Sequence, residues 1–209
     1  MARSLNLPVA ASPRSVAEFD SARRTVVSAP EKEQAVTGRE PGQPPSQDEF
    51  REAMAHLAAA VNIMTTDGPS GRCGVTVSAV CSVTDDPPTV LVCLNRKSAM
   101  HDVFKANGRV CVNVLDGDQQ ELAMHFAGVT NVSMAERFTW DIWDPGQQVP
   151  VLRDALVTVI GVVKDCKPMG SHSVLFVEIE QVRTRRDGRS LVHFNRSFHR
   201  LDSVAPTTG

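Results

Sequence analysis

The sequence contains no tyrosine and only two tryptophans among its 209 residues. Proteins that bind single-stranded nucleic acid or sugars usually stack these ligands on aromatic side chains, so the scarcity argues against both classes. The net charge of −2 argues in the same direction, because nucleic-acid-binding proteins carry a basic excess on at least one face. No apolar run approaches the roughly 18 residues that a membrane-spanning helix needs.

Cysteine pairs with metal-binding or redox spacing are also absent. The five cysteines stand singly inside apolar runs, without a CxxC spacing: Cys73, Cys81, Cys93, Cys111 and Cys166. Such a scattered, odd set is typical of reduced cysteines in the core of a cytoplasmic protein. The first residues, 1–12, are soon followed by Glu18 and Asp20, and they fit neither a secretory signal nor a transit peptide. We therefore expect a cytoplasmic protein.

Familiar catalytic motifs are missing as well. The six histidines form neither HExxH nor a paired Cys/His pattern, so no zinc site is predicted. Neither a GxSxG elbow nor a P-loop occurs, and no GxGxxG follows a predicted strand, which leaves a Rossmann nucleotide site unsupported. A Ser/His/Asp triad stays open on residue order alone, but no residue stands out as a nucleophile.

The composition of the chain changes near residue 45. Six of the 13 prolines lie between Pro8 and Pro45, among polar residues without apolar periodicity. Such a segment cannot bury enough apolar surface to offset its chain entropy. We predict a disordered N-terminal extension over residues 1–45, with a short helix within 15–27 or contact with a partner subunit as alternatives. The folded domain is expected over residues 46–202.

Apolar periodicity predicts a mostly β domain with a few helices. A capping box at Ser46 to Glu49 starts a helix that should end near Ala60. Two more helices are expected over 98–106 and 119–128, with 129–150 irregular. Strands are predicted over 61–66, 73–84, 89–95, 109–115, 155–166, 172–184 and 190–194. Closely spaced strands with few helices favour an antiparallel barrel over a doubly wound sheet.

Polar residues at strand ends are the candidate ligand contacts. Thr76, Ser78 and Ser82 would share one face of a single strand over 73–84. They fit an ordinary solvent face, or a cleft in which small side chains let a planar ring approach the backbone. Residues 95–98 (Asn-Arg-Lys-Ser) lie where a strand enters a helix, and their N–H groups, hydroxyl and two cations fit a phosphate site. An ordinary polar turn is the alternative there.

Six collinear sequence blocks over residues 50–199 carry a more specific signal. They are FREAMAHLAAAVNIMTT, CGVTVSAVCSVTDDPPTVLVCLNRKSAM, CVNVL, HFAG, MGSHSVLFVEI and HFNRSFH. Together they resemble the small flavin reductase components of two-component monooxygenases, of the 4-hydroxyphenylacetate 3-monooxygenase type. The resemblance implies a split β-barrel homodimer that moves hydride from NADH or NADPH to FMN or FAD. The reduced flavin would then serve a separate monooxygenase, the oxygenase component, which hydroxylates an aromatic substrate.

The resemblance also implies four groups of flavin-binding residues. The ring edge would meet Thr76, Val77, Ser78 and Ala79. The wall near the ribityl chain would continue through Cys81 and Ser82, although relatives often carry a hydroxyl where this chain has Cys81. The phosphate would lie at Asn95, Arg96, Lys97 and Ser98. A C-terminal motif would close over the ring with Arg196, Phe198 and His199.

His172 is the implied catalytic residue, beside both flavin and nicotinamide. Without the resemblance, a histidine at a strand start is better explained by a bond to the backbone. Gly170 and His172 match the family's Gly-Asp-His motif, whereas Ser171 replaces its Asp. This departure motivates one alternative, a flavin-binding carrier or sensor without turnover; a reductase of another, quinone-like acceptor is a further one. Most of the chemistry of hydride transfer belongs to the cofactors, which explains why no catalytic dyad stands out.

The sequence leaves open the preference for FMN or FAD and the preference for NADH or NADPH. Discrimination between FMN and FAD depends on loops whose shape the sequence does not give. NADPH would need an extra cationic clamp for its 2′-phosphate, and Arg72, Arg183 and Arg185 are the candidates beside a role as plain surface charge.

Overall fold

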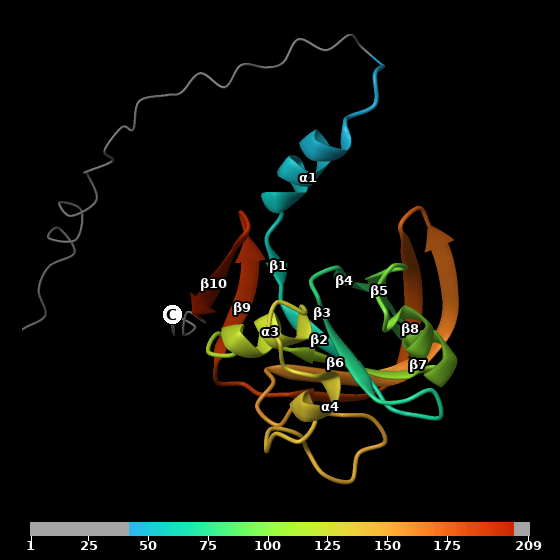
Figure 1. Cartoon of the computed structure of the whole chain (residues 1–209), viewed down its shortest axis with the longest axis vertical. Helices are drawn as coiled ribbons and strands as arrows, with labels where there is room; N and C mark the ends of the chain where they lie inside the picture. Colours follow the sequence, from blue (N-terminus) through green and yellow to red (C-terminus); the bar gives the residue numbers. More distant parts are fainter. Residues whose placement is uncertain (1–41, 203–209) are drawn as a thin grey trace, which may run out of the picture. The chain divides into compact units, whose positions relative to one another are not determined.

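The structure, a computed structural model, describes residues 42–202. The extension predicted over residues 1–45 therefore lies almost wholly outside the described residues. The helices of the described part are α1 (Gln47–Ala55), α2 (His101–Asn107), α3 (Gln120–Phe126) and α4 (Met134–Arg137) (Figure 1). Its strands are β1 (Ala59–Ala60), β2 (Asn62–Thr66), β3 (Cys73–Val77), β4 (Val80–Asp85), β5 (Pro88–Asn95), β6 (Arg109–Val114), β7 (Val157–Met169), β8 (His172–Thr184), β9 (Arg189–Phe194) and β10 (Ser197–Asp202).

The strands form two sheets in which every pairing is antiparallel. Seven strands follow the order β3-β2-β6-β7-β8-β5-β4, and three follow the order β1-β9-β10. The predicted mostly β, antiparallel character is confirmed. Among residues 42–202, no helix combines the length and the apolar character needed to cross a bilayer.

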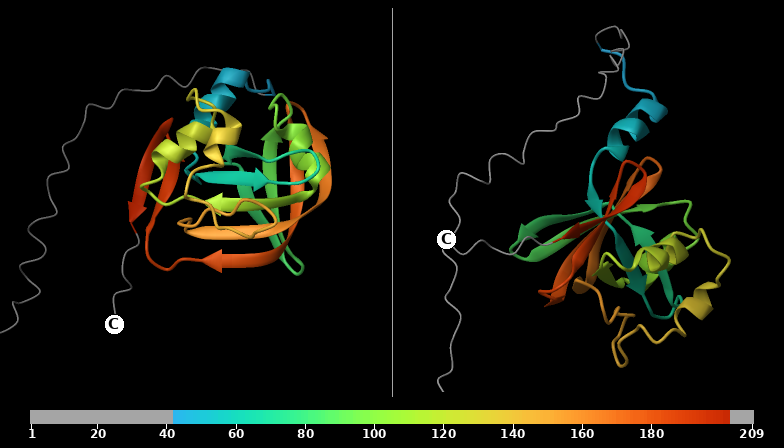
Figure 2. Two further views of the ribbon diagram at one scale, coloured as in Figure 1. Left: turned by 60° about the horizontal axis from the view of Figure 1, so that its bottom comes forward. Right: turned by 90° about the vertical axis from the view of Figure 1, so that its left-hand side faces the viewer.

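The β7–β8 hairpin joins the two halves of the seven-stranded sheet. The first half of β7 pairs with β6, whereas the first half of β8 pairs with β5. The hairpin bends between these halves, as Figures 1 and 2 show for the long strands drawn in orange. Two register shifts lie at the bend, at Ile160/Gly161 and at Val163/Asp165. Such bulges bend a strand and increase its local twist, so they account for the curvature.

The bend wraps the sheet around a hydrophobic core to which both halves contribute. The buried side chains of this core are Met64, Cys73, Val77, Val92, Leu94, Phe104, Val110, Val112, Leu175 and Val177. The edge strands β3 and β4 are consecutive in the chain and are joined only by Ser78-Ala79. The Cys93 N–H on β5 donates to the Ala79 carbonyl at 3.0 Å, which ties this link to the sheet. Each large apolar side chain buried in this way contributes about 1.5–3 kcal/mol.

Two predicted elements differ in the structure. The first helix begins as predicted, because the reciprocal Ser46–Glu49 capping box is present. It ends at Ala55, not near Ala60, because Ala59 and Ala60 pair with β9. The single strand predicted over 73–84 is wrong: the chain leaves β3 after Val77 and enters β4 at Val80.

Three short elements were not predicted at all. β1 has only two residues, and α4 is a single turn inside the stretch predicted to be irregular. β10 follows a tight turn at Asn195 and Arg196, whose φ angles are 47° and 59°. Glycine usually occupies such left-handed positions, so the turn lacks its common sequence signal.

Gly161 is the residue on which the bend depends sterically. A Cβ at this position would collide with the backbone carbonyl of Glu178 on β8. We expect Gly161→Ala to lower the free energy of unfolding by about 1–3 kcal/mol, as overpacking does. Urea denaturation followed by tryptophan fluorescence measures the loss. Gly128→Ala is the control, because its Cβ would meet no atom within 4 Å and only its φ of +77° adds strain. Equal losses in both variants would contradict a steric role for Gly161.

The five cysteines, all within the described part, are free thiols that differ in burial. Burial raises the pKa of the Cys73 thiol and of the Cys111 thiol to about 12. The thiolate is the reactive form, so both should stay unreactive at pH 8 and gain reactivity only as the pH approaches 12. Cys81 is exposed. We expect Cys81 to give the fastest phase with a disulfide reagent on the native protein, and Cys81→Ser to remove that phase. A fast phase that survives in this variant would refute the assignment.

Candidate functional site

Residues 95–98 form a tight turn between β5 and α2. The Asn95 side-chain oxygen accepts from the Lys97 N–H at 2.9 Å, and the Ser98 N–H donates to the Asn95 carbonyl at 3.0 Å. The Ser98 hydroxyl in turn accepts from the Met100 N–H at 3.3 Å. Two of the four predicted phosphate-binding side chains therefore shape the turn, and the side chains of Arg96 and Lys97 are left exposed.

This turn lies against the end of the β7–β8 hairpin. Asn95 pairs with His172 in the β5–β8 ladder. The Arg96 N–H donates to the Ser171 carbonyl at 3.0 Å, and its guanidinium donates to the Gly170 carbonyl at 3.3 Å. The structure thus brings together two predicted elements that are distant in sequence, the phosphate turn and His172.

His172 is half-buried at the first position of β8. Its Nδ1 lies 2.9 Å from the Ser171 hydroxyl, which orients the ring. Its Nε2 has no hydrogen-bond partner within the described part of the chain. This second nitrogen is therefore available to a ligand, as a catalytic or binding role requires.

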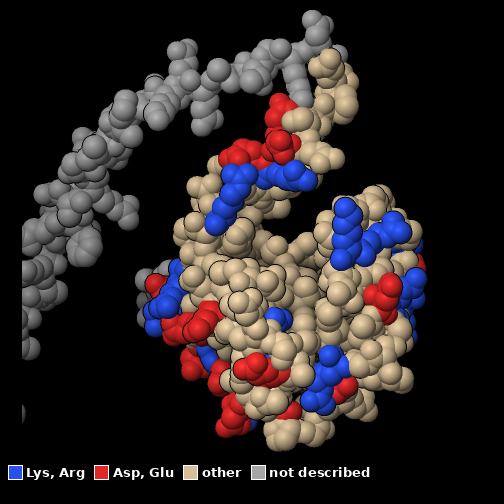
Figure 3. Space-filling view, viewed as in Figure 1, with Lys and Arg blue, Asp and Glu red and all other residues tan. Residues whose placement is uncertain are grey.

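The electrostatics of the turn favour an anion. Neither Arg96 nor Lys97 pairs with a carboxylate among residues 42–202. Figure 3 shows Lys and Arg side chains gathered at the upper right of one face, beside a hollow that separates them from α1. A guanidinium and an ammonium without a carboxylate partner form a suitable environment for a phosphate.

The predicted ring-binding stretch lies beside this turn, on the neighbouring strands. Ser78 and Ala79 are exposed in the link between β3 and β4. On β4, the exposed residues Cys81 and Ser82 pair with Leu91 and Val90 of β5. These four residues keep surfaces that a planar ligand can reach.

The first two residues of that stretch point elsewhere. The Thr76 hydroxyl donates to the Ala123 carbonyl of α3 at 2.7 Å, and Val77 is 7% exposed in the core. Any contact of theirs with a ligand would involve the backbone. The prediction that Thr76, Ser78 and Ser82 alternate on one strand is wrong, because the chain changes strands at Ser78 and Ala79.

The predicted C-terminal group lies on the other sheet. The Arg196 guanidinium pairs with Glu52 of α1 at 2.7 Å, and His199 Nε2 lies 3.1 Å from the Phe194 carbonyl. Phe198 packs against the core beneath α3. Within the described residues, no hydrogen bond or ion pair joins this group to the 95–98 turn or to His172. In one chain the predicted site residues therefore form two separate groups.

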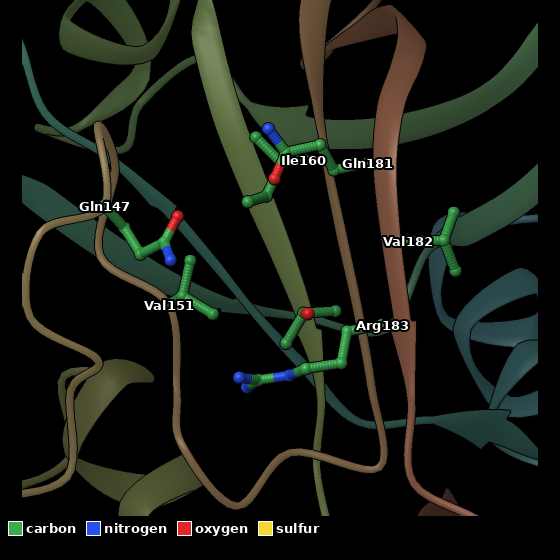
Figure 4. A pocket seen from close by; sticks show the side chains of 7 residues that line it. Gln147, Val151, Ile160, Gln181, Val182 and Arg183 are labelled. Atoms are coloured by element: carbon green, nitrogen blue, oxygen red, sulfur yellow. The ribbon is translucent and has the colours of Figure 1, made fainter.

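Five cavities of the described part are lined by other residues than those of the two groups. The cavity in Figure 4 measures about 80 Å³ and is lined by Gln147, Val151, Thr158, Ile160, Gln181, Val182 and Arg183. A larger one of about 370 Å³ lies beside His125 and Trp140, and one of about 650 Å³ lies beside Arg72 and Phe138. None of the five is lined by a predicted site residue.

The three arginines considered for a 2′-phosphate clamp are engaged in internal ion pairs. Arg72 pairs with Asp67 at 2.6 Å. Arg183 pairs with Asp144, and Arg185 pairs with Asp116. Each cation is thus already balanced by a carboxylate, so none is a free clamp in this structure.

Sequence reasoning missed a buried histidine directly behind the site. His101 Nε2 lies 3.0 Å from the Ser173 hydroxyl, and His101 Nδ1 lies 2.8 Å from the Asp102 carboxylate. The available signal was weak: a polar pair inside a predicted helix, and a serine next to His172.

Comparison with known proteins places this geometry in a family. Residues 54–202 match the family described as "Flavin reductase like domain". The chain is 54% identical over 158 residues to the 4-hydroxyphenylacetate 3-monooxygenase reductase component of Pseudomonas aeruginosa, which covers 75% of this chain and 93% of the relative. It is 47% identical over 161 residues to the FMN reductase (NADH) RutF of Stutzerimonas stutzeri, which covers 77% of this chain and 91% of the relative.

A solved structure agrees with these sequence matches. The crystal structure of BorF, the flavin reductase component of a bacterial two-component tryptophan halogenase, is similar with a TM-score of 0.71 at 25% identity. The similarity covers 76% of this chain and 100% of BorF. Since the family match also spans more than half of the sequence, the chain belongs to the flavin reductase-like domain family.

Proposed function

We propose that this protein is an NAD(P)H:flavin oxidoreductase that transfers hydride from NADH or NADPH to FMN or FAD. The observation that carries the proposal is the 54% identity to a monooxygenase reductase component over 93% of that relative. The 95–98 turn, whose Arg96 and Lys97 pair with no carboxylate among the described residues, lies next to His172. This arrangement supports the proposal, because a flavin mononucleotide combines an anionic phosphate with a planar ring.

The proposed roles of the residues follow from their contacts. Arg96 and Lys97 hold the flavin phosphate, which the free cations of the turn attract. The exposed link at Ser78 and Ala79 offers small side chains and backbone groups against which a planar ring can lie. His172 Nε2 faces the ligand, where it donates to the nucleotide or stabilises negative charge that develops on the ring. Flavin and nicotinamide supply the hydride-transfer chemistry when bound, and the chain orients them.

A separate monooxygenase is the proposed recipient of the reduced flavin, which reaches it by diffusion. The names of the relatives support this, since one is the reductase component of a monooxygenase and another is the flavin reductase component of a two-component halogenase. We place the catalytic domain at residues 46–202, with residues 1–45 as an extension outside it. The five free thiols support a reducing, cytoplasmic compartment.

The proposed architecture is a split β-barrel that works as a homodimer. The strongly bent sheet and the direct link between its edge strands β3 and β4 support the barrel. The α1 segment supports the dimer: no residue of this helix is buried, and its Phe50 and Met54 are 55% and 45% exposed. Leu57, two residues beyond the end of the helix, is 65% exposed. Apolar groups at helical spacing need a partner surface to be stable. A second copy would also bring site residues from two chains together.

We expect the purified protein to oxidise NADH when excess flavin is added, and to yield reduced flavin without oxygen. His172→Ala should lower turnover about tenfold or more while the fold is kept, because an orienting or charge-stabilising group is lost. Absorbance at 340 nm measures the rate. His125→Ala is the matched control, since His125 is half-buried and bonded to Thr130 at 2.7 Å.

Two results would contradict this reading. An inactive wild type with all four pairs of NADH or NADPH with FMN or FAD would refute the reductase. If such a protein retained flavin through gel filtration, the carrier or sensor alternative would replace it. Equal rates in the wild type and in His172→Ala would refute only the role of the histidine.

For the dimer, we expect Phe50→Glu combined with Leu57→Glu to raise the fraction of monomer strongly. The charges would have to be desolvated in the interface, whereas in a monomer they lie in water. Sedimentation velocity measures the species present. Val129→Glu is the control, because Val129 is an equally exposed apolar residue away from α1. A monomeric wild type, or a double variant that stays dimeric, would refute α1 as part of the interface.

A further inference from the structure

His101 is buried at the start of α2, with 9% of its surface exposed. Its ring reaches β8, where Nε2 lies 3.0 Å from the hydroxyl of Ser173, a residue that is only 3% exposed. On the other side, Nδ1 lies 2.8 Å from the carboxylate of the exposed residue Asp102. Both ring nitrogens therefore have a partner inside the chain, and the ring is held in one orientation.

The direction of these hydrogen bonds follows from the chemistry of the partners. A carboxylate only accepts, so the hydrogen of the neutral ring lies on Nδ1 and is donated to Asp102. His101 Nε2 is then an acceptor, and the Ser173 hydroxyl donates to it. Both members of this bond are buried, so water cannot replace either partner.

His101 connects the two elements of the proposed site. Ser173 directly follows His172 on β8, and Leu94 pairs with Ser173 just as Asn95 pairs with His172. The backbone N–H of His101 donates to the Ser98 carbonyl at 3.0 Å. The same residue is therefore bonded to the last position of the 95–98 turn and, through its ring, to the strand that carries His172.

We propose that His101 is a positioning residue that fixes the 95–98 turn, with Arg96 and Lys97, relative to His172. This inference rests on the proposed function, because it takes the turn as the site of the flavin phosphate. The hydrogen bonds from Arg96 to the carbonyls of Ser171 and Gly170 hold the side of the turn that faces the β7–β8 hairpin. The bond from His101 to Ser173 holds the entry into α2, whose N-cap residue Met100 makes no side-chain capping bond.

The proposal predicts that loss of the His101–Ser173 bond weakens the binding of flavins that carry a phosphate more than the binding of flavins without one. Without the buried bond, the turn and the start of α2 are free to shift, and phosphate contacts lose strength when their donors are displaced by even a fraction of an ångström. Riboflavin has the same ring as FMN but lacks the phosphate. Its binding should therefore be almost independent of His101.

The test compares FMN with riboflavin in the wild type, His101→Ala, Ser173→Ala and His101→Gln. In both alanine variants we expect the KM for FMN to rise about tenfold, the equivalent of one lost hydrogen bond to a charged group. The KM for riboflavin should change less than about twofold, and kcat less than about threefold. His101→Gln should restore most of the FMN preference, since its amide oxygen can take the place of Nε2. Lys105→Ala, an exposed change on the same helix, is the surface control.

Quenching of flavin fluorescence supplies the same FMN-to-riboflavin ratio without turnover. An FMN-to-riboflavin affinity ratio that is unchanged in Ser173→Ala and His101→Ala would overturn the proposal. Equal losses of affinity for both flavins leave the ratio unchanged in this way and indicate general destabilisation. Ser173→Ala removes only one hydroxyl and decides the matter if His101→Ala does not fold. A wild type that reduces no flavin would instead refute the proposed function, so the two failures are distinguishable.

Discussion

The bend of the β7–β8 hairpin is the constraint on which the rest of the structure depends. In the strand order of the described part, this hairpin stands between the β3-β2-β6 half and the β5-β4 half of the seven-stranded sheet. A straight hairpin would leave the two halves coplanar and would leave the side chains on their concave face in water. The bulge at Ile160/Gly161 and the lack of a side chain at Gly161 allow the backbone of β7 to approach Glu178. The core that joins Met64 to Val92 and Leu175 follows from this curvature.

The same hairpin also determines where chemistry is possible. Its free end carries Ser171 and His172, and the β5–β8 ladder places Asn95 beside them. Because β5 ends there, the following turn can project two cations without burying them. The site is thus built from backbone pairing, with few side chains committed to chemistry. Such a site suits a reaction in which bound cofactors exchange hydride and the protein orients them.

The fold could be predicted from the sequence to a large extent, and its failures have physical causes. Strands such as 61–66 and 89–95 were predictable because β-branched and apolar runs are a local signal. The break at Ser78 and Ala79 was not, because no glycine or proline marks it. For the site, the pairing of Asn95 with His172 depends on strand order, which periodicity does not contain. His101 was missed for the same reason: its partner Ser173 lies on another strand.

Ser171 shows how a departure from a motif can be read once its contacts are known. In place of a carboxylate, this chain presents a hydroxyl 2.9 Å from His172 Nδ1. A carboxylate would only accept and would keep a hydrogen on Nδ1, so that a neutral ring offers Nε2 as an acceptor. A hydroxyl also donates, which allows the hydrogen to lie on Nε2 and point to a ligand. The substitution therefore keeps a partner that orients the ring and widens the choice of tautomer. On this ground, Ser171 does not favour a carrier over a reductase.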